Sequence, residues 1–292
     1  MKSKKRAGLR LVAVVITGFV LASAPVLAQG TSMFLLDLPG DKVGIRYSHG
    51  SLDRAVQLQD SLDLLVEDFR GWTRAKVNLV VLLLSREEWK ESGFLYPYGM
   101  SEAAGGRGIA LPSWGDDGTV ELWRSLLGTR LPTQPDQPMR GTPEQSASLA
   151  IADLIGSVDA ARILLRGGGF QGDQPWINGL IPQVVVLSYV ENHHAARLPD
   201  VRMAFGDLAK KGGGVGAYPL SAASSPPSLA ARLWFESQFF NGAALLSSAS
   251  CKHPAKAIFK QARKNGGLIQ AAELLAECPE LGTWLRSSFK AE

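Results

Sequence analysis

Few polar side chains in this chain have the types and spacing that chemistry requires, and the most suggestive lie between Ser146 and Glu191. Asp153 and Asp159 are six residues apart, so on a helix they project from different sides and do not form a carboxylate pair. Ser157 precedes Asp159 by two residues, which again places the two side chains on different faces. A serine nucleophile needs a base within hydrogen-bond reach, and no histidine lies near Ser157 in the sequence. A hydrolase site built from Ser157, Asp159 and a histidine from a distant part of the chain remains an alternative.

The four histidines do not form a recognisable ligand set. His193 and His194 follow Glu191 closely, and adjacent residues of a helix point in different directions. We expect them at a solvated helix end, where a protonated imidazole interacts favourably with the helix dipole. His49 and His253 are isolated in the sequence. The sequence therefore predicts no metal site and no cofactor.

Two apolar helices joined by a glycine-rich turn must position these residues. The first helix begins near Ser146, the turn has the sequence GGGFQGDQP over residues 167–175, and the second helix runs to Glu191. The short polar segment of residues 156–159 is expected to interrupt the first helix. The turn does not follow a strand, as a phosphate-binding loop would, so we interpret it as a plain connection.

The sequences of these two helices resemble a known pair. LAIADLIGSVDAARILL and QPWINGLIPQVVVLSYVE are similar to the active-site helix and the glutamate-bearing helix of gluzincin-type metallopeptidases, the peptidase MA-like domain. In that family the first helix carries HExxH, whose histidines bind zinc and whose Glu activates the zinc-bound water. A Glu on the second helix is the third ligand. The resemblance implies an α+β fold, with a small mixed N-terminal sheet and helices followed by a mainly helical, thermolysin-like C-terminal part.

The positions that carry the family's chemistry are replaced in this chain. Ser157, Val158 and Ala161 stand where the family has His, Glu and His, and Gly179 stands where it has the ligand Glu. A methyl group, an isopropyl group and a bare Cα do not bind zinc, and one serine hydroxyl does not replace an imidazole. The resemblance thus implies a non-catalytic pseudo-peptidase that binds an extended peptide or a protein partner, or serves only as a scaffold.

A strand is expected at residues 108–111, where the related peptidases have a strand that borders the cleft and pairs with the substrate backbone. Ile109 and Ala110 are therefore candidate cleft residues, because an exposed edge captures an extended peptide by strand addition. An ordinary edge strand ended by Pro112 is the alternative.

Three further residues complete the candidate cleft. Trp176 and Asn178 resemble residues that position the second helix in the family, and Asp159 lies near the lost ligand positions. For Trp176, packing in the core is the alternative.

The first 28 residues have the pattern of a signal peptide. A basic stretch precedes the apolar run LVAVVITGFVL, and Val26, Leu27 and Ala28 fit a cleavage site for small residues. We expect cleavage after Ala28 and export to the periplasm or beyond. An uncleaved anchor is the alternative, although the run is short for a span of roughly 20 residues.

Removal of this segment changes the charge. It takes five basic residues and leaves 26 Lys and Arg against 27 Asp and Glu. A concentrated basic patch is what nucleic-acid binding requires, so we expect no nucleic-acid partner. No stable membrane anchor is expected after cleavage.

Patterns elsewhere predict the remaining elements. MFLLDL, KVGIRYSH and VNLVVLLL read as strands, the last of them central and buried on both faces. The apolar spacing after Leu58 predicts an amphipathic helix, and Ser85 with Glu88 forms a capping box. Residues 198–228 read as loop-rich, and the chain after them as a helical cap.

The two cysteines, Cys251 and Cys278, flank a helical hairpin in that cap. In an oxidising compartment they predict a structural disulfide. We expect a subdomain of residues 29–145 and a helical one of residues 146–292.

Overall fold

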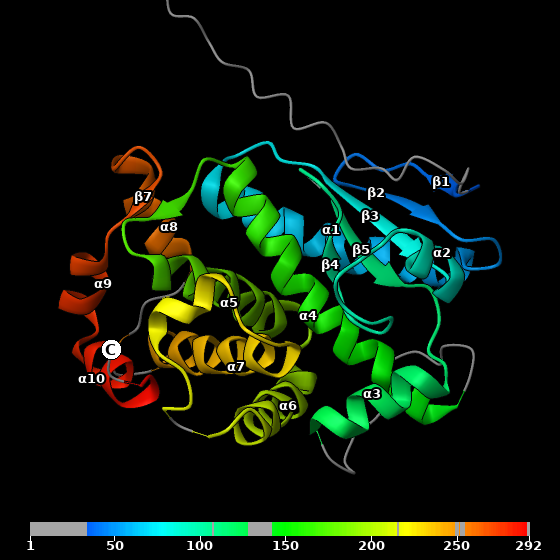
Figure 1. Ribbon diagram of the computed structural model, residues 1–292. Coiled ribbons are helices and arrows are strands. Elements are labelled where there is room, and N and C mark those ends of the chain that lie inside the picture. The colour runs from blue at the N-terminus through cyan, green and yellow to red at the C-terminus, as the bar shows by residue number, and fades with distance from the viewer. Residues whose placement is uncertain are drawn as a thin grey trace, which may run out of the picture.

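The computed structural model describes residues 34–106, 108–127, 142–214, 216–248, 251 and 255–290. The expected signal peptide and His253 lie outside these residues. A five-stranded mixed sheet fills the N-terminal part, in the order β1-β2-β3-β5-β4 (Figure 1). The central three strands are parallel, and an antiparallel strand lies at each edge. The strands are β1 (Leu36–Leu38), β2 (Val43–Tyr47), β3 (Leu79–Leu84), β4 (Glu102–Ala103) and β5 (Gly108–Pro112).

The sheet is centred on β3, as its continuous apolar sequence predicts. Val81 pairs with Ile45 of β2 on one side and with Ile109 of β5 on the other. Leu79, Val81 and Leu83 on this face of β3 are fully buried, but Val80 on the opposite face is 40% exposed. The prediction that β3 is buried on both faces is therefore wrong at Val80.

Two long helices cover the sheet. Helix α1 (Leu52–Thr73) packs against β2, and α4 (Pro143–Gly167) packs against β5. The short helix α2 (Arg86–Glu91) begins at the predicted capping box, in which Ser85 accepts from the Glu88 backbone N–H and the Glu88 side chain accepts from the Ser85 N–H. The predicted box is confirmed.

Helix α4 is continuous, and the expected interruption at residues 156–159 is wrong. The Ser157 hydroxyl donates to the Asp153 carbonyl one turn back, and thus lies along the helix rather than breaking it. Gly156 lets α4 approach β5, because an added Cβ would overlap the side chain of Leu111. The polar segment therefore marks a close contact with the sheet.

The C-terminal part is mainly helical, and the predicted α+β class is confirmed. Figure 1 shows α4 between the sheet and this helical part. Residues 198–211 form a helix, so the loop-rich prediction for 198–228 is wrong over its first half.

A two-stranded parallel sheet, β6 (Gln171–Gly172) with β7 (Leu268–Ile269), joins the turn after α4 to the C-terminal cap. The other helices are α3 (Asp117–Leu127), α5 (Pro175–His193), α6 (Leu198–Lys211), α7 (Leu229–Leu246), α8 (Ala255–Lys264), α9 (Ala271–Glu277) and α10 (Pro279–Ser288), with short 3-10 turns η1 (Ala195–Arg197) and η2 (Leu220–Ser224).

One hydrophobic core runs from the sheet into the cap, from Val43 to Phe289. Helix α7 lies in its C-terminal half and packs against α5 and α6. The predicted disulfide between Cys251 and Cys278 is confirmed and ties the segment after α7 to the start of α10. None of the described helices is both long and apolar enough to cross a membrane.

Candidate functional site

A cavity of about 530 Å³ lies between α4, α5 and α7, with η2 and the β6–β7 pair also contributing to its walls. This volume is within the range of small-ligand pockets, roughly 300–1,000 Å³. Its charged lining consists of Arg162, Arg166, Arg232 and Glu236. Much of the remainder is aromatic or aliphatic, including Tyr96, Leu165, Phe170, Phe235 and Phe239.

Three polar residues of α4 lie on the side of the helix that faces the cavity, and two of them, Arg162 and Arg166, line it. Asp159, Arg162 and Arg166 follow one another at intervals of three and four, so they share one face of the helix. Arg162 donates to Asp159 Oδ1 at 2.8 Å, and it donates to both oxygens of Glu236 at 2.6 and 2.7 Å. One guanidinium thus joins a carboxylate of α4 to a carboxylate of α7.

Arg232 of α7 completes a four-member charge cluster, defined here as Asp159, Arg162, Arg232 and Glu236. It donates to Asp159 Oδ2 at 2.7 Å and to the Ser101 carbonyl at 3.1 Å. The Ser101 hydroxyl also donates to Asp159 Oδ2, at 2.6 Å. The cluster therefore connects both helices to the segment that leads into the edge strand β4.

Tyr96 covers this cluster from the same segment. The Arg232 guanidinium carbon lies 4.3 Å from the centre of the Tyr96 ring, a cation–π arrangement. The Glu102 carboxylate of β4 accepts the backbone N–H groups of Leu95 and Tyr96 and so holds that ring in place. The edge strand thereby positions one wall of the cavity.

The charges of the cluster stabilise one another. Burial alone would raise the pKa of Asp159, but Arg232 and Arg162 outweigh it and lower that pKa below its ordinary value. Burial would lower the pKa of Arg162, and Glu236 and Asp159 raise it instead. Asp159 and Arg162 are consequently both charged at neutral pH.

One buried polar atom beside the cluster has no partner. The Gln183 side-chain amide of α5 donates to Glu236 Oε2 at 2.7 Å, and Gln183 is fully buried. Its Oε1 has no hydrogen-bond partner among the described residues. Glu236 is thus fixed from both α4 and α5.

The four replaced ligand positions do not meet in this cavity. Gly179 lines it, whereas Ser157, Val158 and Ala161 do not. Val158 and Ala161 are fully buried. The polar centre between the helices therefore lies at Asp159 and Arg162, displaced from the positions that the alignment indicates.

The sequence prediction placed the edge of the sheet one strand too early. Ile109 and Ala110 belong to β5, which lies between β3 and β4, and both are fully buried. They cannot pair with a peptide, because β4 already pairs with them through Glu102 and Ala103. The proposed capture of a peptide by residues 108–111 is wrong, and the free edge belongs to β4.

The other candidate cleft residues have mixed positions. Asn178 lines the cavity, and its side-chain oxygen accepts the Gly172 N–H at 2.8 Å, which fixes the turn before α5. Trp176 is buried in the core, which was the alternative to a role in the cleft. Asp159 belongs to the charge cluster.

Sequence reasoning missed Arg162, Arg232 and Glu236. A signal was present, because Arg232 and Glu236 are the two charged residues of the mostly apolar helix α7 and stand four residues apart. Charges in a buried helix require partners. That pattern predicts an ion pair facing another charged helix.

The described residues at the cavity do not fit the zinc ion that the resemblance implies. Among the described residues that line the cavity, Glu236 is the one carboxylate, and there is neither a histidine nor a cysteine. The Glu236 oxygens already accept hydrogen bonds from Arg162 and Gln183. A zinc site needs three or four donor side chains free to coordinate. No catalytic step through a metal follows from this arrangement.

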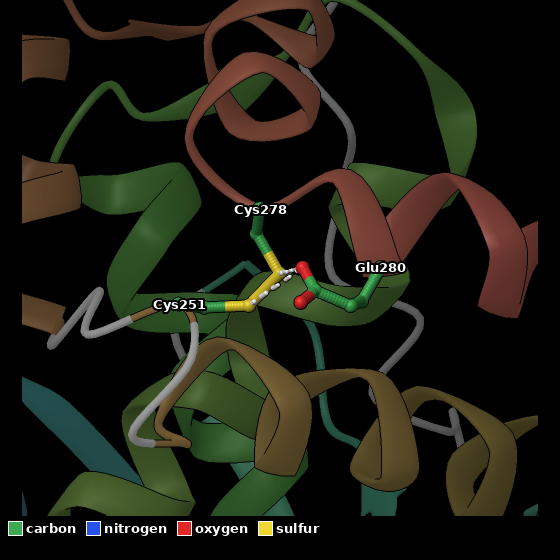
Figure 2. A group of neighbouring side chains, drawn as sticks. All are labelled: Cys251, Cys278 and Glu280. Carbon is green, nitrogen blue, oxygen red and sulfur yellow. Dashed lines mark hydrogen bonds between the residues drawn. A yellow bond between two sulfur atoms is a disulfide. The ribbon is translucent and has the colours of Figure 1, made fainter.

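One group elsewhere has the residue types of a metal site, namely Cys251, Cys278 and Glu280 (Figure 2). The two sulfurs are joined to each other, and Glu280 Oε2 lies 3.8 and 3.9 Å from them. A disulfide sulfur has no proton to donate and is not a thiolate ligand. The group is a close contact at the start of α10.

The alternative hydrolase site also lacks its parts. The Ser157 hydroxyl donates to Asp153, and both Asp159 oxygens are engaged by the cluster. The two histidines at the C-terminal end of α5 have other partners: His193 contacts Asp68 at 3.1 Å, and His194 contacts the Tyr189 hydroxyl at 2.8 Å. Ser157 thus has no base to activate it in the described contacts.

Comparison with protein-family models, with curated proteins and with solved structures gave no match for this chain.

Proposed function

We propose that this chain is an exported, non-catalytic pseudo-peptidase of gluzincin-like fold that binds an extended peptide or protein segment. The observation that carries the proposal is the cavity between α4, α5 and α7, the two helices of the resemblance together with one from the cap. It has the size of a binding site, and the four residues of the charge cluster are held in mutual ion pairs rather than arranged around a reacting centre.

The edge of the sheet supports a peptide as the occupant. Tyr96 lines the cavity, and Ser101 holds Arg232 immediately before β4. An extended peptide paired with the outer edge of β4 would therefore run beside the cavity. Strand addition supplies backbone hydrogen bonds, and the cavity supplies a pocket for a side chain. In this proposal Glu102 and Ala103 of β4, rather than residues 108–111, would pair with the peptide backbone.

Export is supported by two features. The first 28 residues have the pattern of a signal peptide, and the chain contains a disulfide, which persists in oxidising compartments. The folded chain then acts in the periplasm or outside the cell.

Peptide retention tests this function. The purified chain is incubated with a pool of random decapeptides, and bound peptides are separated by gel filtration and identified by mass spectrometry. We expect a selected subset to be retained. The variant Ser224→Trp places a large ring at an exposed position of the cavity wall. This variant should no longer retain the peptides. The variant Ser221→Trp, on the same 3-10 turn but outside the lining, is the control. Retention of no peptide by the unchanged chain would overturn the proposal.

A further inference from the structure

We propose that the cavity selects peptides with a free C-terminal carboxylate, and that Arg166 binds this carboxylate while the aromatic lining takes an apolar last side chain. This inference rests on the proposed function and specifies its ligand class.

The charge balance of the lining is the first step. In the charge cluster the two arginines are compensated by Asp159 and Glu236 through direct hydrogen bonds. Arg166 lines the same cavity and remains outside this network. It lies in the last turn of α4 and is exposed, and no described residue accepts a hydrogen bond from it or forms an ion pair with it. The cavity therefore has one uncompensated positive charge.

The chemistry of Arg166 selects the anion. A guanidinium presents paired N–H donors that match the two oxygens of a carboxylate or phosphate. A phosphate would bring close to two negative charges into a cavity that also holds Glu236 and offers one free cation among its described lining residues. A carboxylate brings one charge. Charge complementarity thus favours a carboxylate.

The apolar part of the lining determines which side chain can accompany the carboxylate. Phe170, Phe235 and Phe239 line the cavity with Leu165 and Ile269, and these groups favour an apolar or aromatic side chain. In the last residue of a peptide the carboxylate and the side chain share one Cα. A peptide ending in Phe or Leu therefore presents both groups together, whereas an internal Asp or Glu does not.

Matched peptide pools test the inference. Both pools are N-acetyl pentapeptides that end in Phe after four random positions, one as the free acid and the other as the C-terminal amide. We expect the free acids to bind about tenfold more tightly, the effect of one charge-assisted hydrogen-bonded pair. Arg166→Gln should lower the affinity for the free acids to the affinity for the amides. Arg166→Lys should have an intermediate affinity for the free acids, because lysine keeps the positive charge but lacks the paired N–H donors of a guanidinium. Arg286→Gln, an exposed arginine outside the lining, is the matched control and should change nothing.

The outcomes separate the two proposals. Equal binding of acids and amides, lost in Ser224→Trp, would overturn the role of Arg166 and leave peptide binding intact. A preference for acids that survives Arg166→Gln would do the same. An amide pool with Glu as its last residue, binding as well as the free acids, would show that a side-chain carboxylate is the ligand and contradict the inference. Binding of none of the three pools would remove the proposed function and the inference with it.

Discussion

The charge cluster between α4 and α7 makes a quantitative prediction about folding stability. Asp159 accepts three hydrogen bonds, from Arg162, Arg232 and Ser101. The substitution Asp159→Asn keeps the shape of the side chain and removes its charge. Arg232 then has no carboxylate partner of its own, while Arg162 keeps Glu236. The change removes two ion pairs, Asp159 with Arg162 and Asp159 with Arg232, and Arg232 is the partner left without a carboxylate in the described contacts.

The expected cost follows from the burial of the Asp159–Arg232 pair. The Arg232 and Asp159 side chains are 9% and 10% exposed. Removing one partner of a buried pair costs roughly 3–5 kcal/mol, and the remaining Arg162–Glu236 pair places this case near 3 kcal/mol. For a chain of this size, that loss lowers the Tm by about 6–12 °C. The free energy of unfolding is measured by urea denaturation at pH 7.

A double-mutant cycle distinguishes pairing from general disruption. Asp159→Asn combined with Arg232→Gln removes both charges, so the double variant should be more stable than the sum of the two single losses indicates, by about 1 kcal/mol or more. Glu67→Gln is the matched control, because Glu67 forms an exposed pair with Lys42 and its loss should change the free energy of unfolding far less than Asp159→Asn does. Strict additivity in the cycle, or an Asp159→Asn variant as stable as the unchanged chain, would refute the reasoning.

The pH dependence has a defined sign. The pKa of Asp159 is lower in the folded chain than its ordinary value, so the folded state binds its proton less readily than the unfolded state does. Its contribution is present above the unfolded pKa of about 3.9 and is lost as the pH falls through the folded pKa. The stability difference between the unchanged chain and Asp159→Asn should therefore shrink below about pH 4. A difference that stays constant to lower pH would contradict the ion-pair account.

Three further variants test the packing around the cavity and the contribution of the disulfide. Gly179→Ala should destabilise the chain by about 1–3 kcal/mol, because the added Cβ overlaps the Phe239 ring, whereas Gly206→Ala in α6, where the space is open, should stabilise it by about 0.5–1 kcal/mol. Thermal unfolding monitored by circular dichroism compares the pair, and equal effects would show that α5 and α7 are not in close contact. Cys251→Ser with Cys278→Ser removes a link across 27 residues and should cost about 3–4 kcal/mol, measured against the unchanged chain under non-reducing conditions. Unchanged stability would mean that the loop closed by the disulfide is equally restricted without it.

Local signals in the sequence predicted local structure well. The continuous apolar run gave β3, the Ser85 and Glu88 spacing gave the start of α2, and the cysteine pair gave the disulfide. In each case the physical cause lies within a few residues or in a covalent rule, so no knowledge of the tertiary structure is needed.

Features that depend on tertiary contacts were predicted poorly. The polar residues 156–159 looked like a helix break, but the contact of Gly156 with β5 and the partners of Asp159 keep α4 continuous. Strand β4 has only two residues and no sequence signal, so β5 was mistaken for the edge. The charge cluster joins residues more than 70 positions apart, and spacing along one helix does not reveal such a partner.

The central claim is that the cavity holds a peptide and does not cut it. The most direct measurement incubates the chain with the peptides that it retains, with and without excess zinc, and follows their masses over time. The account predicts full-length peptides in both conditions and unchanged retention. Shortened peptides that appear with zinc and disappear with a chelator would contradict it.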